Sequence, residues 1–196
     1  EVHNCTFKGN NVTSTANNRG TGGALNVRSE GFVTISDCSF EDNFASQKGG
    51  AVVCGGADIK NSNFTSNSVG TGSVAGSGGA VYISKKNGIS LTVSDSRFED
   101  NKLINKNGLG SAIATENNAK IQNSNFTNNQ APSQNRAGAV YHSKSLTVEG
   151  SLFEDNQGAP NYFNIYNNGG SQSISTTTFK TFAPTLNVEE EGVTDM

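Results

Sequence analysis

The sequence is poor in most of the residues that build an ordinary hydrophobic core. Among its 196 residues there is no Trp, and it has only three Pro, three Cys and one Met. Val, Ile, Leu and Phe together make up about a fifth of the chain, a composition close to that of intrinsically disordered proteins. Disorder is therefore the first hypothesis. Against it stand a net charge of only −3 and a regular recurrence of the apolar residues.

The sequence also lacks features that several classes of function require. The acidic balance and the lack of a basic stripe argue against a nucleic-acid partner. No stretch is apolar over the length of a membrane span, and no signal peptide is present. The two histidines, His3 and His142, are far apart, and neither has a nucleophile or metal-ligand cluster near it in the sequence. We therefore expect no catalytic residues, no metal and no cofactor.

A Phe followed three positions later by Asn recurs along the chain. The motif FEDN occurs at residues 40–43, 98–101 and 153–156, with FTSN at 64–67 and FTNN at 126–129 between the copies. A second motif, Gly-Gly-Ala followed by an aliphatic residue, alternates with the first at 22–27, 49–54 and 78–83, and in variant form at 110–115 and 137–142. Two motifs that alternate in phase indicate a repeat architecture.

Alternation with a period of two residues assigns short strands to each repeat. Val81 and Ile83 share one face, opposite Tyr82. Phe98 lies out of step with the strand before it, which indicates a corner near Asp95. Three short strands per repeat, with polar corners and inward apolar side chains, predict an all-β fold, a right-handed parallel β-helix of about six coils. At about 4.8 Å per stacked rung, the rod would be about 30 Å long.

Equivalent positions of successive coils stack directly in such a fold. Each repeated Phe would lie on the next, and each Asn amide would bond the amides above and below it. The predicted Phe column contains Phe7, Phe40, Phe64, Phe98, Phe126 and Phe153, and the predicted Asn column contains Asn10, Asn43, Asn67, Asn101, Asn129 and Asn156. Both columns would be structural.

These motifs resemble the passenger repeats of the polymorphic outer-membrane proteins, autotransporter adhesins that present a β-helix outside the cell. The resemblance covers about Phe7 to Asn156 and implies a β-helix at the cell surface. Beyond it, residues 161–168 replace Gly-Gly-Ala, and FKTF at 179–182 lacks the Asn, so we expect the helix to end or change there. We assign residues 1–182 to the β-helix and 183–196 to an acidic tail, which is a linker, a cap or an assembly segment.

Acidic pairs follow the repeated Phe in every second coil. They are Glu41-Asp42, Glu99-Asp100 and Glu154-Asp155. Like charges on adjacent rungs would repel at about 5 Å, and alternation doubles that distance. The true unit is then a double coil of roughly 57 residues.

The coils between the acidic pairs carry N-glycosylation sequons. Asn63 and Asn125 lie next to an inward Phe and therefore point outward, and further sequons begin at Asn4 and Asn11. They carry glycans only if the protein passes through a eukaryotic secretory pathway. Otherwise they are ordinary outward amides.

Cysteines and tyrosines supply the remaining candidate residues. Cys5 and Cys38 lie two residues before a repeated Phe. On adjacent rungs their Cα atoms would be about 4.8 Å apart, which suits a disulfide, although two free buried thiols are the alternative. Cys54 is expected to be a small core residue rather than a reactive thiol. Tyr82 and Tyr141 point outward and are candidate surface contact residues.

Taken together, these features favour a structural or adhesive extracellular protein over an enzyme. The chain starts inside a coil, and uncapped strand edges template further coils. It is thus expected to be a segment of a longer surface protein or a subunit of an end-to-end stacked fibril. Its expected partners are copies of itself or neighbouring repeats, N-linked glycans, and a carbohydrate or cell-surface ligand. The alternative is a polysaccharide-binding or polysaccharide-cleaving β-helix, which would need carboxylates converging in a groove.

Overall fold

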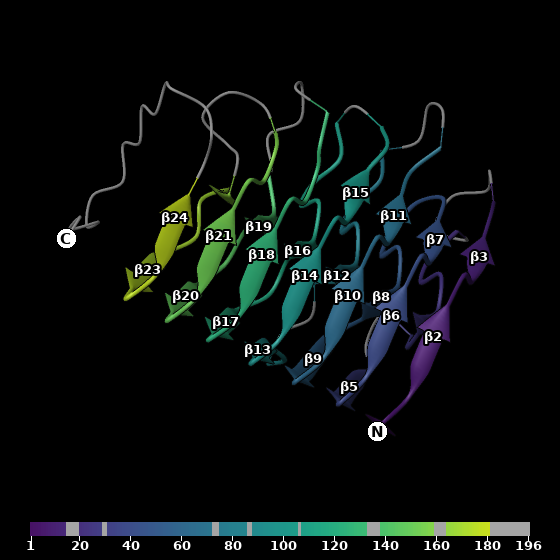
Figure 1. Cartoon of the computed structure of the whole chain (residues 1–196), viewed down its shortest axis with the longest axis horizontal. Helices are drawn as coiled ribbons and strands as arrows, with labels where there is room; N and C mark the ends of the chain where they lie inside the picture. The colour runs from purple at the N-terminus through teal and green to yellow at the C-terminus, as the bar shows by residue number, and fades with distance from the viewer. Residues whose placement is uncertain are drawn as a thin grey trace.

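The chain forms a stack of short parallel strands. The computed structural model describes residues 1–14, 20–28, 31–71, 75–85, 88–105, 107–132, 138–158 and 164–180. These residues contain strands β1 to β24 and no helix. Each strand pairs in parallel with the equivalent strand of the coil before or after it, and Figure 1 shows the resulting row of stacked coils. The fold is a parallel β-helix, and the all-β prediction is confirmed.

Four sheets run along the stack, named here in the order in which one coil visits them. Sheet 1 contains β4 (Leu25–Asn26), β8 (Val52–Cys54), β12 (Val81–Ile83), β16 (Ile113–Thr115), β19 (Val140–His142) and β22 (Ile165–Asn167). Sheet 2 contains β1 (Val2–His3), β5 (Phe32–Ser36), β9 (Gly56–Lys60), β13 (Leu91–Ser94), β17 (Ala119–Gln122), β20 (Leu146–Glu149) and β23 (Gln172–Ser175).

Sheet 3 carries the repeated Phe, and sheet 4 is a narrow strip beside it. Sheet 3 contains β2 (Thr6–Lys8), β6 (Ser39–Glu41), β10 (Asn63–Thr65), β14 (Arg97–Glu99), β18 (Asn125–Thr127), β21 (Leu152–Glu154) and β24 (Thr178–Lys180). Sheet 4 contains β3 (Asn11–Val12), β7 (Phe44–Ala45), β11 (Ser68–Val69) and β15 (Lys102–Leu103). The sequence predicted three strands per coil and missed sheet 4, because its strands are too short to show alternation.

Residues with positive φ recur at three of the turns of the coils. Between sheets 2 and 3 these residues are Asn4, Asp37, Asn61, Asp95, Asn123, Gly150 and Thr176; between sheets 3 and 4 they are Gly9, Asp42, Ser66, Asp100, Asn128 and Asp155. Before sheet 1 they are Gly22, Gly49, Gly78 and Gly110. Asn, Asp and Gly tolerate this left-handed conformation better than other residues. The corner predicted near Asp95 is confirmed, with φ of 50° at Asp95 itself.

The repeated Phe residues fill the interior beneath sheet 3. Ring centroids of neighbouring Phe residues from Phe7 to Phe153 lie 4.7–4.9 Å apart, with the planes within 7° of parallel. Phe40 through Phe153 are completely buried. The spacing equals the rung spacing, so parallel pairing of the strands itself imposes the ring-on-ring stack.

The Asn residues that follow the Phe form a second buried column. The Asn67 side chain shows the pattern: its Nδ2 donates to the Asn101 Oδ1 (3.0 Å) and to the Phe40 carbonyl (2.9 Å). Its Oδ1 accepts from the backbone N and the Nδ2 of Asn43 (3.1 and 2.9 Å). Because all four hydrogen-bonding positions are used, these bonds offset the cost of removing the amide from water.

Beyond Asn156, where we expected the helix to end or change, the stack continues. Strands β22, β23 and β24 continue sheets 1, 2 and 3, and Phe179 lies 5.2 Å from Phe153. The Asn column does stop: Asn156 donates instead to Asn164 Oδ1 at 3.1 Å. The described chain thus has six coils, from β4 to β24, preceded by the partial coil β1 to β3, and the first three of the six have a strand in all four sheets. The predicted tail, residues 183–196, and the boundary at 182 lie outside the described residues.

Candidate functional surface

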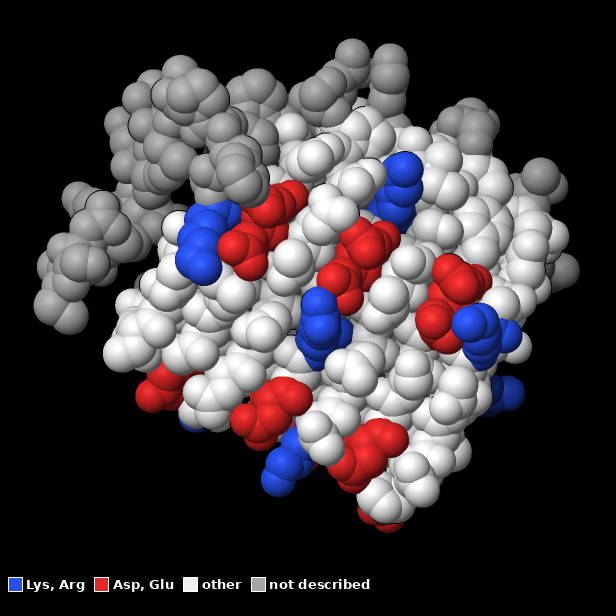
Figure 2. Space-filling view, in the orientation of Figure 1, with Lys and Arg blue, Asp and Glu red and all other residues white. Residues whose placement is uncertain are grey.

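Most of the candidate residues gather on the outer face of sheet 3. We call the outward side chains of its strands, together with the two flanking corners, the sheet 3 face. Figure 2 looks onto this face and shows acidic groups in a row across it, with basic side chains beside them. On each strand the residues before and after the buried Phe point outward. Apart from Leu152 in β21, the outward side chains on these strands are polar, and the Phe column lies directly beneath them.

The Glu and the Asp of each acidic pair occupy their positions for different structural reasons. The Glu points outward from a sheet 3 strand and is paired with a base: Glu41 with Lys8 Nζ (2.9 Å), Glu99 with Arg97 Nη2 (2.8 Å) and Glu154 with Lys180 Nζ (3.5 Å). The hydrogen bond from Lys8 to Glu41 raises the pKa of Lys8. The Asp occupies the corner with positive φ. Ion pairing and turn geometry thus explain the acidic pairs without a catalytic role.

Neutral rungs separate the acidic ones. The register places Thr65 between Glu41 and Glu99 on the same face. Asn128 Nδ2 donates a short hydrogen bond to Asp100 Oδ1 on the adjacent rung. The adjacent coil therefore supplies a donor to an Asp rather than a second negative charge.

An amide–carboxylate column that the sequence analysis missed runs along the other corner of this face. Asn61 Nδ2 donates to Asp37 Oδ1 at 2.6 Å, and Asn123 Nδ2 to Asp95 Oδ1 at 3.5 Å. Asn4 precedes them at the equivalent position. The signal was present as an alternation of Asn and Asp three residues before each repeated Phe from Phe7 to Phe126, but it lay outside the motifs that defined the repeat.

All four sequon asparagines lie at the surface. Asn63 and Asn125 are exposed at equivalent positions in β10 and β18, two coils apart. Asn4 is exposed at a corner, and Asn11 is exposed in β3. A glycan at any of them would extend into solvent without unfolding the chain. Glycosylation itself stays a prediction.

The expectation that Tyr82 and Tyr141 are surface contact residues is wrong. Both point away from the main core, yet they are only 5% and 6% exposed. They pack in a second cluster on the outer side of sheet 1, with Val53 and Ala114. Sequence alternation gives the direction of a side chain but not what covers it.

Polar partners hold Tyr82 in this outer cluster. Lys48 Nζ lies 4.4 Å from the centre of the Tyr82 ring and 3.1 Å from its hydroxyl, which donates a short hydrogen bond to Glu116 Oε1. Burial, with the Glu116 hydrogen bond, raises the pKa of Tyr82. Lys48 precedes Gly49, which has φ of 56°, so the Gly-Gly corner helps to bring a charged residue over the sheet. The pattern that spaced Tyr82 and Tyr141 thus builds packing, not a contact site.

Cys5 and Cys38 are free thiols, so the disulfide alternative is not realised. Each thiol donates to a backbone carbonyl two residues earlier, Cys5 Sγ to His3 O (3.2 Å) and Cys38 Sγ to Ser36 O (3.0 Å). The Cys38 sulfur also accepts from the Cys5 backbone N at 3.4 Å. Each sulfur is thus engaged by the backbone rather than by the other sulfur. The second alternative is also only half right, since Cys38 is buried but Cys5 is exposed.

The Cys38 position belongs to a column of corner hydroxyls that the sequence analysis did not recognise as a ladder. Ser62 Oγ accepts from the Cys38 backbone N (3.1 Å) and donates to the Lys60 carbonyl (2.8 Å). The same two bonds recur at Ser96, Ser124 and Ser151. Each hydroxyl therefore closes its own corner and joins it to the previous coil.

Cys54 faces the core in β8 and is completely buried. Burial raises the pKa of its thiol to about 12. A thiol with so high a pKa stays protonated at neutral pH, and only the thiolate is nucleophilic. Cys54 is thus a packing residue.

The histidines do not come together. His3 is at the surface, where its Nδ1 lies 3.2 Å from Asp37 Oδ2. His142 is buried, with Nδ1 2.8 Å from the Lys144 carbonyl and Nε2 3.0 Å from Gln172 Oε1. Among the described residues, no three His, Cys, Asp or Glu side chains are grouped so as to hold a metal ion. No helix in that part of the chain is long and apolar enough to cross a membrane.

One coil of the stack matches a known repeat family. The match covers residues 37–55, from the corner before β6 through β7 to the end of β8. The family is the Chlamydia polymorphic membrane protein repeat. This segment contains one copy of each of the two motifs, FEDN and Gly-Gly-Ala. No curated protein and no solved structure matches the chain.

Proposed function

We propose that the chain is a rigid repeat segment of a surface-exposed protein and presents the sheet 3 face to its surroundings. The observation that carries this proposal is the match of residues 37–55 to the Chlamydia polymorphic membrane protein repeat. The matched unit recurs along the stack as sheets 3, 4 and 1, so the likeness extends in architecture to the neighbouring coils.

The construction of the stack supports a scaffold role. Buried columns of Phe, Asn and corner hydroxyls run from coil to coil, and each coil bonds the next through its backbone and through these side chains. In a solenoid of this kind, each coil gains stability from its neighbours and the whole resists bending. Such a body suits a protein that must hold surface features at fixed spacing.

The sheet 3 face supports a role in presentation or adhesion. Each Glu of the acidic pairs has a basic partner, and the outward residues that follow the Phe alternate between Glu and Thr from β6 to β21. A face whose outward Glu residues all have basic partners stays hydrated, and its corners and sequons project regularly from it. Copies of the chain or neighbouring repeats could add to the stack through parallel strand edges, as the existing coils do.

Surface labelling tests whether the protein is exposed at the cell surface. Intact cells of the source organism are treated with a membrane-impermeant amine reagent, and modification of Lys8 and Lys180, which are exposed on this face, is measured by mass spectrometry. Labelling in intact cells equal to that in lysed cells supports surface exposure. Labelling only after lysis overturns it. Electron microscopy of the native material then separates a filament or a long rod from discrete short particles.

A further inference from the structure

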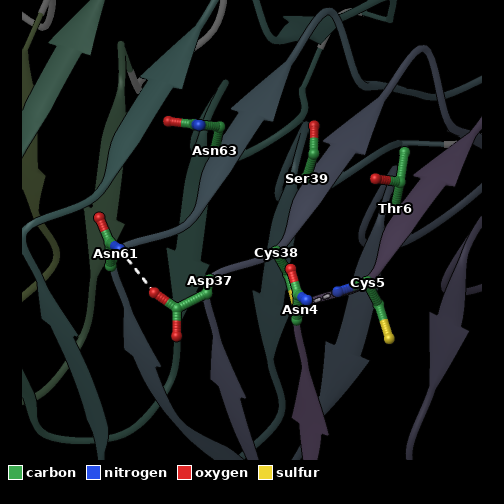
Figure 3. A pocket seen from close by; sticks show the side chains of 8 residues that line it. All are labelled: Asn4, Cys5, Thr6, Asp37, Cys38, Ser39, Asn61 and Asn63. Atoms are coloured by element: carbon green, nitrogen blue, oxygen red, sulfur yellow. Dashed lines mark hydrogen bonds between the residues drawn. The ribbon is translucent and has the colours of Figure 1, made fainter.

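A shallow pocket of about 280 Å³ opens at the corner between sheets 2 and 3, across the first three coils. Figure 3 shows Thr6, Ser39 and Asn63 side by side on three successive strands of sheet 3, with Asp37 and Asn61 at the corner beside them. Asn4, Cys5 and Cys38 complete the lining. The wall contains carboxamides, a carboxylate, hydroxyls and thiols, and no hydrocarbon or aromatic side chain.

Two kinds of polar group face this pocket. Asp37 and Asn61 hold each other through a 2.6 Å hydrogen bond, and the other Asp37 oxygen lies 3.2 Å from His3 Nδ1. The side chains of Asn4, Thr6, Ser39 and Asn63, by contrast, make no hydrogen bond to the part of the chain that the structure describes. The pocket thus combines a fixed carboxylate–amide pair with free donors and acceptors.

The chemistry of the lining narrows the class of ligand. Neither Lys nor Arg lines the pocket, so a phosphate or sulfate would meet the Asp37 carboxylate without compensation. One carboxylate is too few for a calcium ion, which takes six to eight oxygen ligands. An apolar ligand would find no apolar wall. Sugar hydroxyls, each both donor and acceptor, match a lining of amides, hydroxyls and one carboxylate.

We propose that this pocket binds one ring of a neutral, hydroxyl-rich sugar. Its volume is just below the roughly 300–1,000 Å³ of sites for drug-sized ligands, which suits a single ring. Vicinal hydroxyls would bridge the fixed Asp37–Asn61 pair, and Ser39 and Asn63 would bond the opposite edge. Without an aromatic platform the affinity of one site is on the order of 1 mM. The proposal names a ligand for the face described above, but it does not depend on the location of the protein in the cell.

The residue at the same register two coils on is an arginine. There Arg97 stands where Ser39 stands in the pocket, and its guanidinium lies 2.8 Å from Glu99. The fold therefore accepts an arginine at this register, and the chain itself supplies the substitution that would close the pocket.

The sugar could come from two sources. Asn63 and Asn4 begin sequons and line the pocket, so a glycan attached to either would start at its wall. A saccharide from solution or from another cell surface would present the same hydroxyls. Intact mass of protein from its native source distinguishes a covalent sugar from a bare chain.

Two-dimensional amide NMR of the whole chain, titrated with glucose, galactose, mannose and N-acetylglucosamine, tests the proposal. At least one sugar should shift the amide signals of residues 4–6, 37–39 and 61–63. The variant Ser39→Arg should weaken binding at least tenfold. Leu152→Arg, at the same register of β21 and outside the pocket, should bind as the unaltered chain does, and both variants should keep the dispersed spectrum of the folded protein.

Each result decides the question. No shift up to about 20 mM of any sugar, far above the expected dissociation constant, overturns the proposal, as does equal binding by the Ser39→Arg variant. If the native protein carries a sugar on Asn63, nuclear Overhauser contacts between that sugar and residues 37–39 support the covalent source. A sugar that makes no such contact overturns it. These measurements use purified protein, so their failure leaves the surface-labelling experiment independent.

Discussion

Replacing Asn101 by Ala should remove about 4 kcal/mol from the free energy of unfolding. The Asn101 side chain is completely buried and makes four hydrogen bonds. Its Oδ1 accepts from the backbone N and Nδ2 of Asn67, both at 3.0 Å, and its Nδ2 donates to the Phe64 carbonyl (2.9 Å) and to Asn129 Oδ1 (3.0 Å). At about 1 kcal/mol net for each bond, the sum is about 4 kcal/mol, and the unpaired buried Asn67 N–H would add to it.

Urea unfolding followed by far-ultraviolet circular dichroism measures this effect. With a slope of about 2 kcal/mol per molar urea, the midpoint should fall by about 2 M. Because solenoids can unfold in segments, hydrogen exchange of the Asn67 amide gives a local check, and its protection should drop most.

Asn10→Ala is the matched control for this substitution. Asn10 occupies the same column at the first coil, is exposed, and its side chain donates one hydrogen bond, to Asn43 Oδ1 at 2.8 Å. It should cost at most about 1 kcal/mol. If the two variants lose equal stability, the argument that the buried Asn column stabilises the stack is refuted.

Four further substitutions or conditions test other parts of the stack. Ser96→Ala should cost about 2 kcal/mol, because Ser96 Oγ donates to the Ser94 carbonyl (2.7 Å) and accepts from the Ser62 backbone N (3.1 Å); an unchanged urea midpoint would contradict the corner role. Gly78→Ala should lower the melting temperature strongly, since φ is +69° and an added Cβ would lie 2.2 Å from the Val81 carbonyl oxygen; calorimetry measures this, and a shift of less than about 1 °C would refute it. The Cys54 thiol should resist iodoacetamide at pH 8.5 until urea unfolds the chain, whereas the exposed Cys5 reacts at once. In the folded protein the pKa of the Cys54 thiol is raised from 9.0 to about 12. The thiol therefore loses its proton at a lower pH in the unfolded chain than in the folded one. Stability should fall by about 1.4 kcal/mol per pH unit above pH 9, a component that Cys54→Ala lacks.

The spacing of a few residues in the sequence predicts much of the fold. The alternation of FxxN with Gly-Gly-Ala predicted stacked parallel coils, and the structure has them. Parallel stacking repeats every side chain at one rung spacing, so a residue type that recurs in the sequence recurs in space. The contacts between the coils of a solenoid can therefore be predicted from its sequence, because they are contacts between equivalent positions of the repeat.

The sequence did not show which outward side chains would be covered. Tyr82 and Tyr141 alternate with core residues just as an exposed residue would, yet Lys48 and the outer side of sheet 1 bury them. Alternation with a period of two residues separates the two faces of a strand, but it does not show what packs against each face. Sheet 4 was missed for a related reason. Its strands have only two residues each, so they can be recognised only by their pairing with strands of neighbouring coils.

By itself the sequence determined the class of fold, the register of the coils and the positions of the corners, because those depend on local backbone preference and on repetition. Only the tertiary structure decided how individual side chains are used. It made Ser62 and Cys38 backbone partners rather than surface or disulfide residues, paired Asp37 with Asn61 and opened a pocket at Ser39, whose equivalent two coils on, Arg97, pairs with Glu99. These outcomes depend on which residues face each other across neighbouring rungs and at the corners. A repeat motif read one coil at a time does not contain that information.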